Sequence, residues 1–357
     1  MTLRSDRPLR ILFGSAHPYL PQMYGGAQSS TDELVRHLRM RGHEAAVLAG
    51  LTGEGWLGLR GRVALKLTRR GYVRDVQLGY PVFRAWFAEQ AVARVVRDFR
   101  ADVAIFQSMR PVPLAQAVAG QDLRTFIYLR NVEKGDLGGP IDALSGVRFI
   151  ANSGFTARHF AETDGIDADV LYPMIDPAKY RVDARRESVV FINPHPSKGA
   201  GVALDVAELC PDIPFTFVRG WGLSPEDEEV LQTRLKRLPN VTLLPSTNDM
   251  RSVYAMARIV LAPSQWEEAF GRVAAEAQVS GIPVVASAIG GLPEAVGPGG
   301  RLVAPDAPAE DWAQAIRALH SDEQAYSAAS EAARAHAARP AMDPKRQIDQ
   351  LLEILQS

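Results

Sequence analysis

Two glutamates, Glu268 and Glu276, are the residues whose type and spacing most clearly suggest chemistry. Glu268 lies in an acidic loop just before a predicted helix from about Gly271 to Ser280, and Glu276 lies inside that helix, with seven residues between the two. A carboxylate in a helix that packs on a sheet is costly to bury unless something binds it. The start of the helix offers free N–H groups that attract anions. Two hydrogen-bond acceptors beside an anion site suit a ligand with both hydroxyls and phosphates, such as a nucleotide sugar.

The composition is that of an ordinary globular protein. The length of 357 residues suggests two domains, and the net charge of −1 does not favour nucleic acid as a partner. The single Cys210 excludes a disulfide framework and a cysteine-based zinc site. The first residues lack the apolar core of a signal peptide, and no run approaches the roughly 18 apolar residues of a membrane span. We therefore expect a cytoplasmic protein.

The first part of the chain has the pattern of a parallel crossover unit. A short apolar strand at 10–14 precedes a long loop that ends in Gly25-Gly26, and a helix at 27–41 and a strand at 43–49 follow. Glycines just before a helix let the backbone approach a phosphate or sugar closely, although a lone glycine pair equally well makes a simple turn.

Polar residues follow the next two predicted strands, at 102–106 and 125–129. Gln107 comes directly after the first and Arg130 after the second. In open parallel sheets the ligand lies beyond the carboxyl ends of the strands, so both residues are candidates for a site. A fifth strand at 148–151 follows, and a polar run at 179–187 is the predicted domain boundary.

A second series of strands and helices begins at Ser188. Its strands are predicted at 189–192, 214–218, 241–244, 259–262 and 282–286, with helices between them and further helices at 309–320, 322–338 and 344–356. Lys198-Gly199 lies between a strand end and a helix start, where a point charge suits a diphosphate, although a solvated loop lysine is the alternative. The predicted domains are 1–178 and 188–338, and the helix at 340–357 is expected to pack on the first domain.

Residues 51–100 carry ten Arg and Lys against four Asp and Glu. Trp56, Val63 and Leu67 would share one face if 56–74 were helical, with basic residues elsewhere around the helix. Such a segment would contact anionic lipid at the inner membrane face or an acidic acceptor. The alternative, which we favour, is a solvated basic loop.

The whole pattern resembles the GT-B architecture, and specifically the family 4 retaining glycosyltransferases. The stretch PSQWEEAFGRVAAEAQVSGIPVVAS is similar to the signature of that family, with Glu268 and Glu276 as its two glutamates. Weaker matches occur in the right order along the chain, among them Gly25-Gly26, Lys198-Gly199 and Gly290-Gly291. The resemblance implies two Rossmann-like domains that face each other across a donor-binding cleft, and transfer from a nucleotide sugar without a metal ion.

The resemblance also implies roles for individual residues. Glu276 would accept hydrogen bonds from the ribose, Glu268 would hold hydroxyls of the donor sugar, and Lys198 would neutralise the departing diphosphate. Such charge and N–H donors aimed at an anionic leaving group lower the barrier. The implied donor-binding set is Gly25, Gly26, Lys198, Gly199, Arg219, Glu268, Ala269, Phe270, Gly271, Arg272 and Glu276.

The sequence departs from the family pattern at three places. The family usually has an arginine shortly before the lysine, where this chain has Asn193-Pro194. Arg272, Arg219 and Arg130 are the candidates for that missing cation. Arg130 and Gln107 each stand where the family often has a histidine, so His17 is the histidine of the first domain that we would test for catalysis, together with Arg130.

The predicted function is transfer of a hexose, with UDP- or GDP-hexose as the leading donors, to a hydroxyl of a glycan, glycolipid or small molecule. Seven histidines without ligand spacing give no metal site, so we expect no cofactor. One alternative is a synthase or phosphorylase that uses a sugar phosphate; another is a non-catalytic nucleotide-binding protein. A NAD enzyme is disfavoured because no G-x-G-x-x-G follows the first strand.

Overall fold

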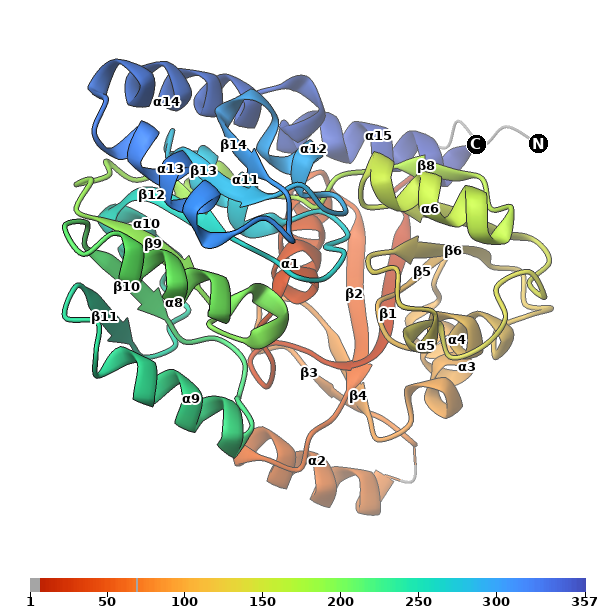
Figure 1. Cartoon of the computed structure of the whole chain (residues 1–357). Helices are drawn as coiled ribbons and strands as arrows, with labels where there is room; N and C mark the ends of the chain where they lie inside the picture. The colour runs from red at the N-terminus through yellow and green to blue at the C-terminus, as the bar shows by residue number, and fades with distance from the viewer. Residues whose placement is uncertain (1–6, 69) are drawn as a thin grey trace. The chain divides into compact units, whose positions relative to one another are not determined.

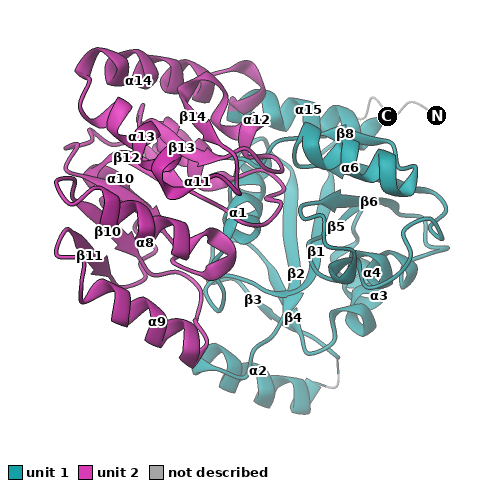
Figure 2. Ribbon diagram, in the orientation of Figure 1, with its two compact units in different colours: residues 1–174, 344–357 teal, residues 175–343 magenta. Residues whose placement is uncertain are grey.

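The structure is a computed structural model that describes residues 7–68 and 70–357. The chain forms two compact units, shown in Figure 1 and coloured separately in Figure 2. Unit 1 comprises the residues up to Met174 together with Pro344–Ser357, and unit 2 comprises Ile175–Asp343. Each unit is an α/β fold on a largely parallel sheet, which confirms the predicted fold class.

The sheet of unit 1 has the strand order β3-β4-β2-β1-β5-β6-β7-β8 among the described residues. Its strands run parallel except for β3, which is antiparallel to β4. The strands are β1 (Arg10–Pro18), β2 (Glu44–Gly50), β3 (Val73–Asp75), β4 (Val82–Ala85), β5 (Val103–Gln107), β6 (Arg124–Leu129), β7 (Val147–Ala151) and β8 (Ala168–Val170).

Helices of unit 1 cover both faces of this sheet. They are α1 (Gly26–Met40), α2 (Gly55–Thr68), α3 (Ala88–Phe99), α4 (Pro111–Gln116), α5 (Lys134–Leu137), α6 (Gly154–Asp164) and α15 (Pro344–Gln356). Successive side chains of a strand point to opposite faces. Accordingly Ile11 and Phe13 of β1 join the apolar core that contains α1 and α15, while Leu12 joins the core that contains α3.

Unit 2 repeats the plan with a six-stranded sheet in the order β11-β10-β9-β12-β13-β14 among its described strands. These are β9 (Ser188–Ile192), β10 (Phe215–Val218), β11 (Val241–Leu244), β12 (Ala257–Ala262), β13 (Val284–Ser287) and β14 (Gly300–Val303). The helices are α7 (Pro177–Tyr180), α8 (Ala200–Leu209), α9 (Pro225–Leu235), α10 (Met250–Met256), α11 (Arg272–Gln278), α12 (Leu292–Val296), α13 (Ala309–His320) and α14 (Glu323–Ala337).

The terminal helix α15 packs on unit 1, as the sequence predicted (Figure 2). Ile348 and Leu351 are buried in the same core as β1. Arg124 of β6 donates to the carbonyl oxygen of Leu355 at 2.5 Å, and Gln347 donates to the carbonyl oxygen of Tyr172 at 3.1 Å. The last helix is therefore held by both apolar and polar contacts.

Residues 175–187 belong to unit 2, although the sequence placed 175–178 in the first domain and 179–187 in a linker. The backbone explains the difference. Val182 N–H donates to Ser280 Oγ at 2.9 Å, and Arg185 N–H and Glu187 N–H donate to carbonyl oxygens of Ala255 and Met256. The polar composition of this run suggested a linker, but its backbone groups are fixed on unit 2.

The basic stretch after β2 contains the helix that the sequence offered as the less favoured alternative. Residues 55–68 form helix α2, so our preference for a solvated loop was wrong. No helix of the described residues is long and apolar enough to cross a membrane. Strand β4 was missed because it contains an arginine, yet Arg84 is fully buried.

The buried guanidinium of Arg84 fixes the loop that follows β1. Its Nε donates to Asp75 Oδ2 of β3 at 2.5 Å, and its terminal nitrogens donate to the carbonyl oxygens of Tyr19 at 3.4 Å and Leu20 at 2.6 Å. Nearby, Tyr80 donates to Asp32 of α1 at 2.8 Å. Burial raises the pKa of Tyr80 above its ordinary value, so this hydroxyl stays protonated as a donor.

We predict that Arg84→Met lowers the free energy of unfolding by about 3 kcal/mol, because it leaves a buried carboxylate and two loop carbonyls without their donor. Urea unfolding measures the change. The matched control is Arg94→Met, whose ion pair with Asp98 is exposed on α3 and is worth about 0.5 kcal/mol. Equal stability of the two variants would show that the buried pair contributes nothing.

Candidate functional site

In unit 2 two loops are joined closely at the carboxyl edge of the sheet. One follows β9 and contains Lys198-Gly199; the other follows β12 and contains Glu268. Gln265 N–H donates to the carbonyl oxygen of Ser197 at 2.9 Å. Gly199 has φ +82°, and a Cβ there would lie 1.9 Å from the carbonyl oxygen of Pro263. Only glycine permits this approach.

The joined loops bring Lys198 and Glu268 into direct contact. Lys198 Nζ donates to Glu268 Oε1 at 2.6 Å, although seventy residues separate the two in sequence. Both side chains are mostly buried. The structure thus places together the two residues to which the resemblance gave the leaving group and the donor sugar.

Two tryptophans flank this ion pair. Lys198 Nζ lies 4.9 Å from the ring centroid of Trp221 and 4.4 Å from that of Trp266, and the two rings are 5.7 Å apart. His195 makes an edge contact with Trp221, at 5.6 Å between ring centroids. A cation over indole faces is stabilised by the ring quadrupole. The aromatic side chains were not singled out from sequence; the only signal was their position at strand ends.

Asn193 takes a positioning role at the end of β9, where the family pattern has an arginine. It has φ +66°, and its side-chain Oδ1 accepts from Trp221 N–H at 2.9 Å. A Cβ on Gly220 would lie 2.7 Å from the Asn193 side chain, so the loop after β10 approaches the loop after β9 closely. The residue at this place therefore holds Trp221 rather than supplying positive charge.

Glu276 is buried in α11 and engaged through both carboxylate oxygens. Arg272 Nε donates to its Oε1 at 2.7 Å, and Tyr254 donates to its Oε2 at 2.8 Å. Burial raises the pKa of Tyr254 well above its ordinary value, so the phenol keeps its proton. Arg272 also donates to the hydroxyl of Tyr180 at 2.6 Å. These hydrogen bonds show how the buried carboxylate of Glu276 is stabilised.

The loop from Ala269 to Gly271 approaches the turn before α12. Gly291 N–H donates to the carbonyl oxygen of Glu268, and a Cβ on Gly291 would lie 2.5 Å from the carbonyl oxygen of Ala269. Phe270 is buried, and Gly271 has φ +101°, which favours glycine. Helix α11 begins at Arg272, one residue later than expected.

Arg219 lies after β10 and pairs with Glu228 of α9. Its guanidinium binds both carboxylate oxygens, at 2.8 and 2.5 Å. This pairing, with a further hydrogen bond from Gln232, lowers the pKa of Glu228 to about 2. A role for Arg219 in binding diphosphate would require this bidentate pair to open.

In unit 1 the predicted site residues lie at the carboxyl ends of three neighbouring strands. His17 is the next-to-last residue of β1, Gln107 ends β5 and Arg130 follows β6, and β5 lies between the other two strands. Ser108 directly after β5 has φ +60°, an uncommon conformation for a residue with a side chain. The topology therefore gathers these three residues at one edge of the sheet.

The environments of these three residues differ. Burial lowers the pKa of His17, with Asp136 partly opposing the shift, so the ring is neutral near pH 7. Gln107 donates to Thr31 Oγ1 at 2.8 Å, while its Oε1 is buried without a hydrogen bond among the described residues. Arg130 stacks on Tyr128, with Cζ 4.1 Å from the ring centroid.

Gly25 is the N-cap of α1, and Gly26 is its first residue. No side chain of the described residues makes a capping hydrogen bond at this end. Gly25 has φ −178°, which any residue adopts, and a Cβ there would lie 2.7 Å from Oε1 of the buried Gln28 side chain. Open N–H groups at the start of a long helix suit an anionic or hydroxyl-rich ligand.

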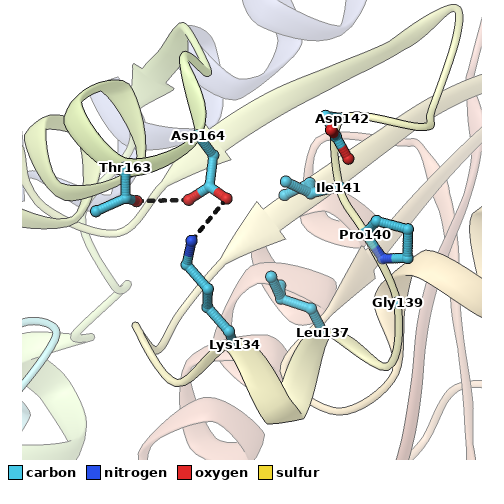
Figure 3. Close-up of a pocket in the computed structure, with 8 residues that line it drawn as sticks. All are labelled: Lys134, Leu137, Gly139, Pro140, Ile141, Asp142, Thr163 and Asp164. Atoms are coloured by element: carbon cyan, nitrogen blue, oxygen red, sulfur yellow. Dashed lines mark hydrogen bonds and ion pairs between the residues drawn. The ribbon is translucent and has the colours of Figure 1, made fainter.

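A cavity of about 460 Å³ in unit 1 lies apart from all of these residues (Figure 3). Lys134 and Asp164 on its wall form an ion pair of 2.9 Å, and none of the predicted site residues lines it. Across residues 7–68 and 70–357, no cluster of three His, Cys, Asp or Glu is arranged to hold a metal ion.

Comparisons with known proteins bear on the family and the fold of the chain. A model of Glycosyltransferase Family 4 matches residues 24–179, and a model of Glycosyl transferases group 1 matches residues 188–322. The chain is similar to the D-inositol 3-phosphate glycosyltransferase of Segniliparus rotundus, with 32% identity over 60% of this chain and 56% of the relative. The enzyme of that name from Mycolicibacterium vanbaalenii is 34% identical over 46% and 44%. The chain thus spans about half the length of these curated relatives.

Solved structures share the fold over almost the whole chain. Anabaena Alr3699/HepE, in complex with UDP and glucose, has a TM-score of 0.77 at 22% identity and covers 97% of this chain and 99% of its own. Sucrose-phosphate synthase from Thermosynechococcus elongatus has a TM-score of 0.77 at 16% identity, over 97% and 98%. From the two family models, the signature around Glu268 and the shared GT-B fold, we conclude that the chain belongs to the family 4 glycosyltransferases.

Proposed function

We propose that this chain is a retaining glycosyltransferase that moves a hexose from a nucleotide diphosphate sugar to an acceptor hydroxyl, without a metal ion. The observation that carries the proposal is the Lys198–Glu268 contact of 2.6 Å. It joins a cation suited to a diphosphate and a carboxylate suited to sugar hydroxyls at the edge where parallel sheets bind ligands.

The reaction breaks the bond between the sugar C1 and the diphosphate oxygen and forms a bond from C1 to the acceptor oxygen on the same face. The acceptor proton passes to the departing phosphate, so the nucleoside diphosphate leaves with both electrons of the broken bond. Lys198 and the amides of Phe270 to Arg272 would stabilise the charge that develops there. His17 and Arg130 are the proposed catalytic residues of unit 1.

The leading donors are UDP- and GDP-hexoses. One structural neighbour is described in complex with UDP-glucose, which supports a uridine nucleotide, and Glu276 would receive the ribose hydroxyls. The hydrogen bonds from Arg272 and Tyr254 hold this carboxylate in a fixed orientation for that task. The acceptor is proposed to be a hydroxyl of a glycan, a glycolipid or a small molecule.

We further propose that the protein acts in the cytoplasm, with peripheral contact at the inner membrane face through residues 56–74. Support for the location comes from the free, buried thiol of Cys210 and the proposed use of a nucleotide sugar. Support for the membrane contact is the helical structure of 55–68 and its basic composition.

Glu268→Ala should lower turnover of the donor by at least roughly 100-fold, because the donor sugar loses a charged hydrogen-bond acceptor in the transition state. Release of nucleotide from UDP- and GDP-hexoses measures the change, and the melting temperature shows that the fold persists. Glu267→Ala, at the exposed neighbouring position, is the matched control and should keep full activity. Full activity of Glu268→Ala would refute the assignment.

Lys198→Ala should reduce kcat by roughly 100-fold or more, because it removes the cation that receives the leaving group. Lys198→Arg should recover part of this loss, since the charge remains but its geometry changes. Lys236→Ala, an exposed lysine after α9, controls for loss of charge. If wild-type protein binds nucleotide but neither hydrolyses nor transfers the donor sugar, the chain is a non-catalytic nucleotide-binding protein.

Binding of the correct donor should raise the melting temperature and change tryptophan emission, because Trp221 and Trp266 adjoin Lys198. A panel of UDP-, GDP-, dTDP- and CDP-sugars identifies the base. The emission change should disappear in Trp221→Phe/Trp266→Phe and persist in Trp56→Phe, which alters an exposed tryptophan of unit 1. Persistence in the double variant would mean that the donor binds away from the pair.

A further inference from the structure

Helix α2 lies against unit 1 on a face made of small residues. Gly58 and Gly61 are buried on that face. A Cβ on Gly58 would lie 2.5 Å from the carbonyl oxygen of Thr52, and a Cβ on Gly61 would lie 2.8 Å from Cδ2 of Leu51. The helix therefore packs closely on the chain segment that follows β2. The face that carries Gly58 and Gly61 is buried by this contact.

The opposite face of α2 displays large apolar side chains to solvent. The exposed fractions are 72% for Trp56, 51% for Leu59, 53% for Val63 and 79% for Leu67. Spacings of three and four residues place these four side chains in one stripe along the helix. Single exposed apolar residues are ordinary, but a continuous stripe marks an interaction surface. We call these four residues the outer stripe.

Positive charge surrounds the outer stripe. Residues 55–74 contain six Arg and Lys and no Asp or Glu, although the whole chain carries a net charge of −1. Arg60, Lys66 and Arg70 are exposed and form no ion pair with any residue that the structure describes. An apolar stripe with flanking cations fits a surface that offers both anionic groups and hydrocarbon, which is the headgroup region of an anionic bilayer.

The chain before α2 is tied to the loop after β1. Gln22 Nε2 donates to the carbonyl oxygens of Thr52 at 3.2 Å and Glu54 at 3.3 Å, and Thr52 N–H donates to Gln22 Oε1 at 3.4 Å. Figure 1 shows α2 at the periphery of unit 1. Since α2 follows the carboxyl end of β2, a surface bound to the outer stripe would lie at the edge that also carries Gly25-Gly26.

We propose that the outer stripe of α2 docks unit 1 on anionic membranes, with its apolar side chains in the headgroup region and its cations on lipid phosphates. Docking through the outer stripe specifies the membrane contact proposed above. Its biological purpose rests on the proposed function. Vesicle binding is nevertheless measured without any transfer reaction, so the two ideas succeed or fail separately.

The test is co-sedimentation of the full chain with vesicles of phosphatidylcholine alone and with 30% phosphatidylglycerol. Binding should require the anionic lipid and weaken as salt rises. The Arg60→Glu/Lys66→Glu variant should partition at least roughly 20-fold less, since each cation contributes about a factor of five. Trp56→Ser/Val63→Ser should lose binding even at low salt, because the stripe no longer enters the headgroup region.

Two matched controls distinguish the loss of charges and apolar side chains on α2 from general damage to the protein. Met40→Ser removes a side chain of α1 in the same unit that is 71% exposed, and Lys236→Glu reverses an exposed charge in unit 2. Both should bind vesicles like the wild type. All variants should keep the wild-type rate of donor hydrolysis in solution, which reports on the Lys198–Glu268 site.

Three results would overturn the proposal. The first is absence of vesicle binding by the wild type at low salt. The second is equal binding by the wild type and the stripe variants. The third is a wild-type dimer that Trp56→Ser/Val63→Ser converts to a monomer, which would assign the stripe to a second copy of the chain. Loss of donor hydrolysis with intact vesicle binding would instead refute the proposed function alone.

Discussion

The structure of unit 2 depends on an attraction between two loops that are far apart in sequence. The Lys198–Glu268 contact requires the loop after β9 to lie against the loop after β12, which the absence of a side chain at Gly199 permits. The ion pair in turn sits beside the indole rings of Trp221 and Trp266. Cation, carboxylate and aromatic faces thus share one small volume, which is what a ligand with charge, hydroxyls and rings requires.

Glu276 illustrates a different solution for a buried carboxylate. Its charge is compensated inside unit 2 by Arg272 four residues earlier on the same helix, and by the phenol of Tyr254 from α10. Burying one charge alone is expensive, whereas a paired and hydrogen-bonded carboxylate is tolerated. Arg272 was a candidate for the missing phosphate cation, and the structure shows that a substantial part of its guanidinium serves Glu276 and Tyr180.

The sequence predicted most of the fold from local rules, and it marked Lys198 and Glu268 one by one through their loop positions and the family resemblance, without showing that they touch. Apolar strands and glycine-ended helices are visible in the order of residues, and Glu268 and Lys198 lie at recognisable loop positions. Trp221 and Trp266 were missed because their meeting depends on how loops 45 residues apart pack. Strand β4 was missed because Arg84 is buried through partners on β3 and in a distant loop, which periodicity does not reveal. The glycine face of α2 likewise becomes intelligible only against Leu51.

Gln22 joins two segments that sequence treats as independent. Its side chain accepts from and donates to the backbone that leads into α2, while its own backbone belongs to the loop that ends at Gly25-Gly26. Insertions or deletions at 51–54 would therefore disturb the glycine loop as well as the helix. Among related chains, adaptation of α2 to a new surface is then constrained to exchange of its outward side chains, with the length of the connecting segment held fixed.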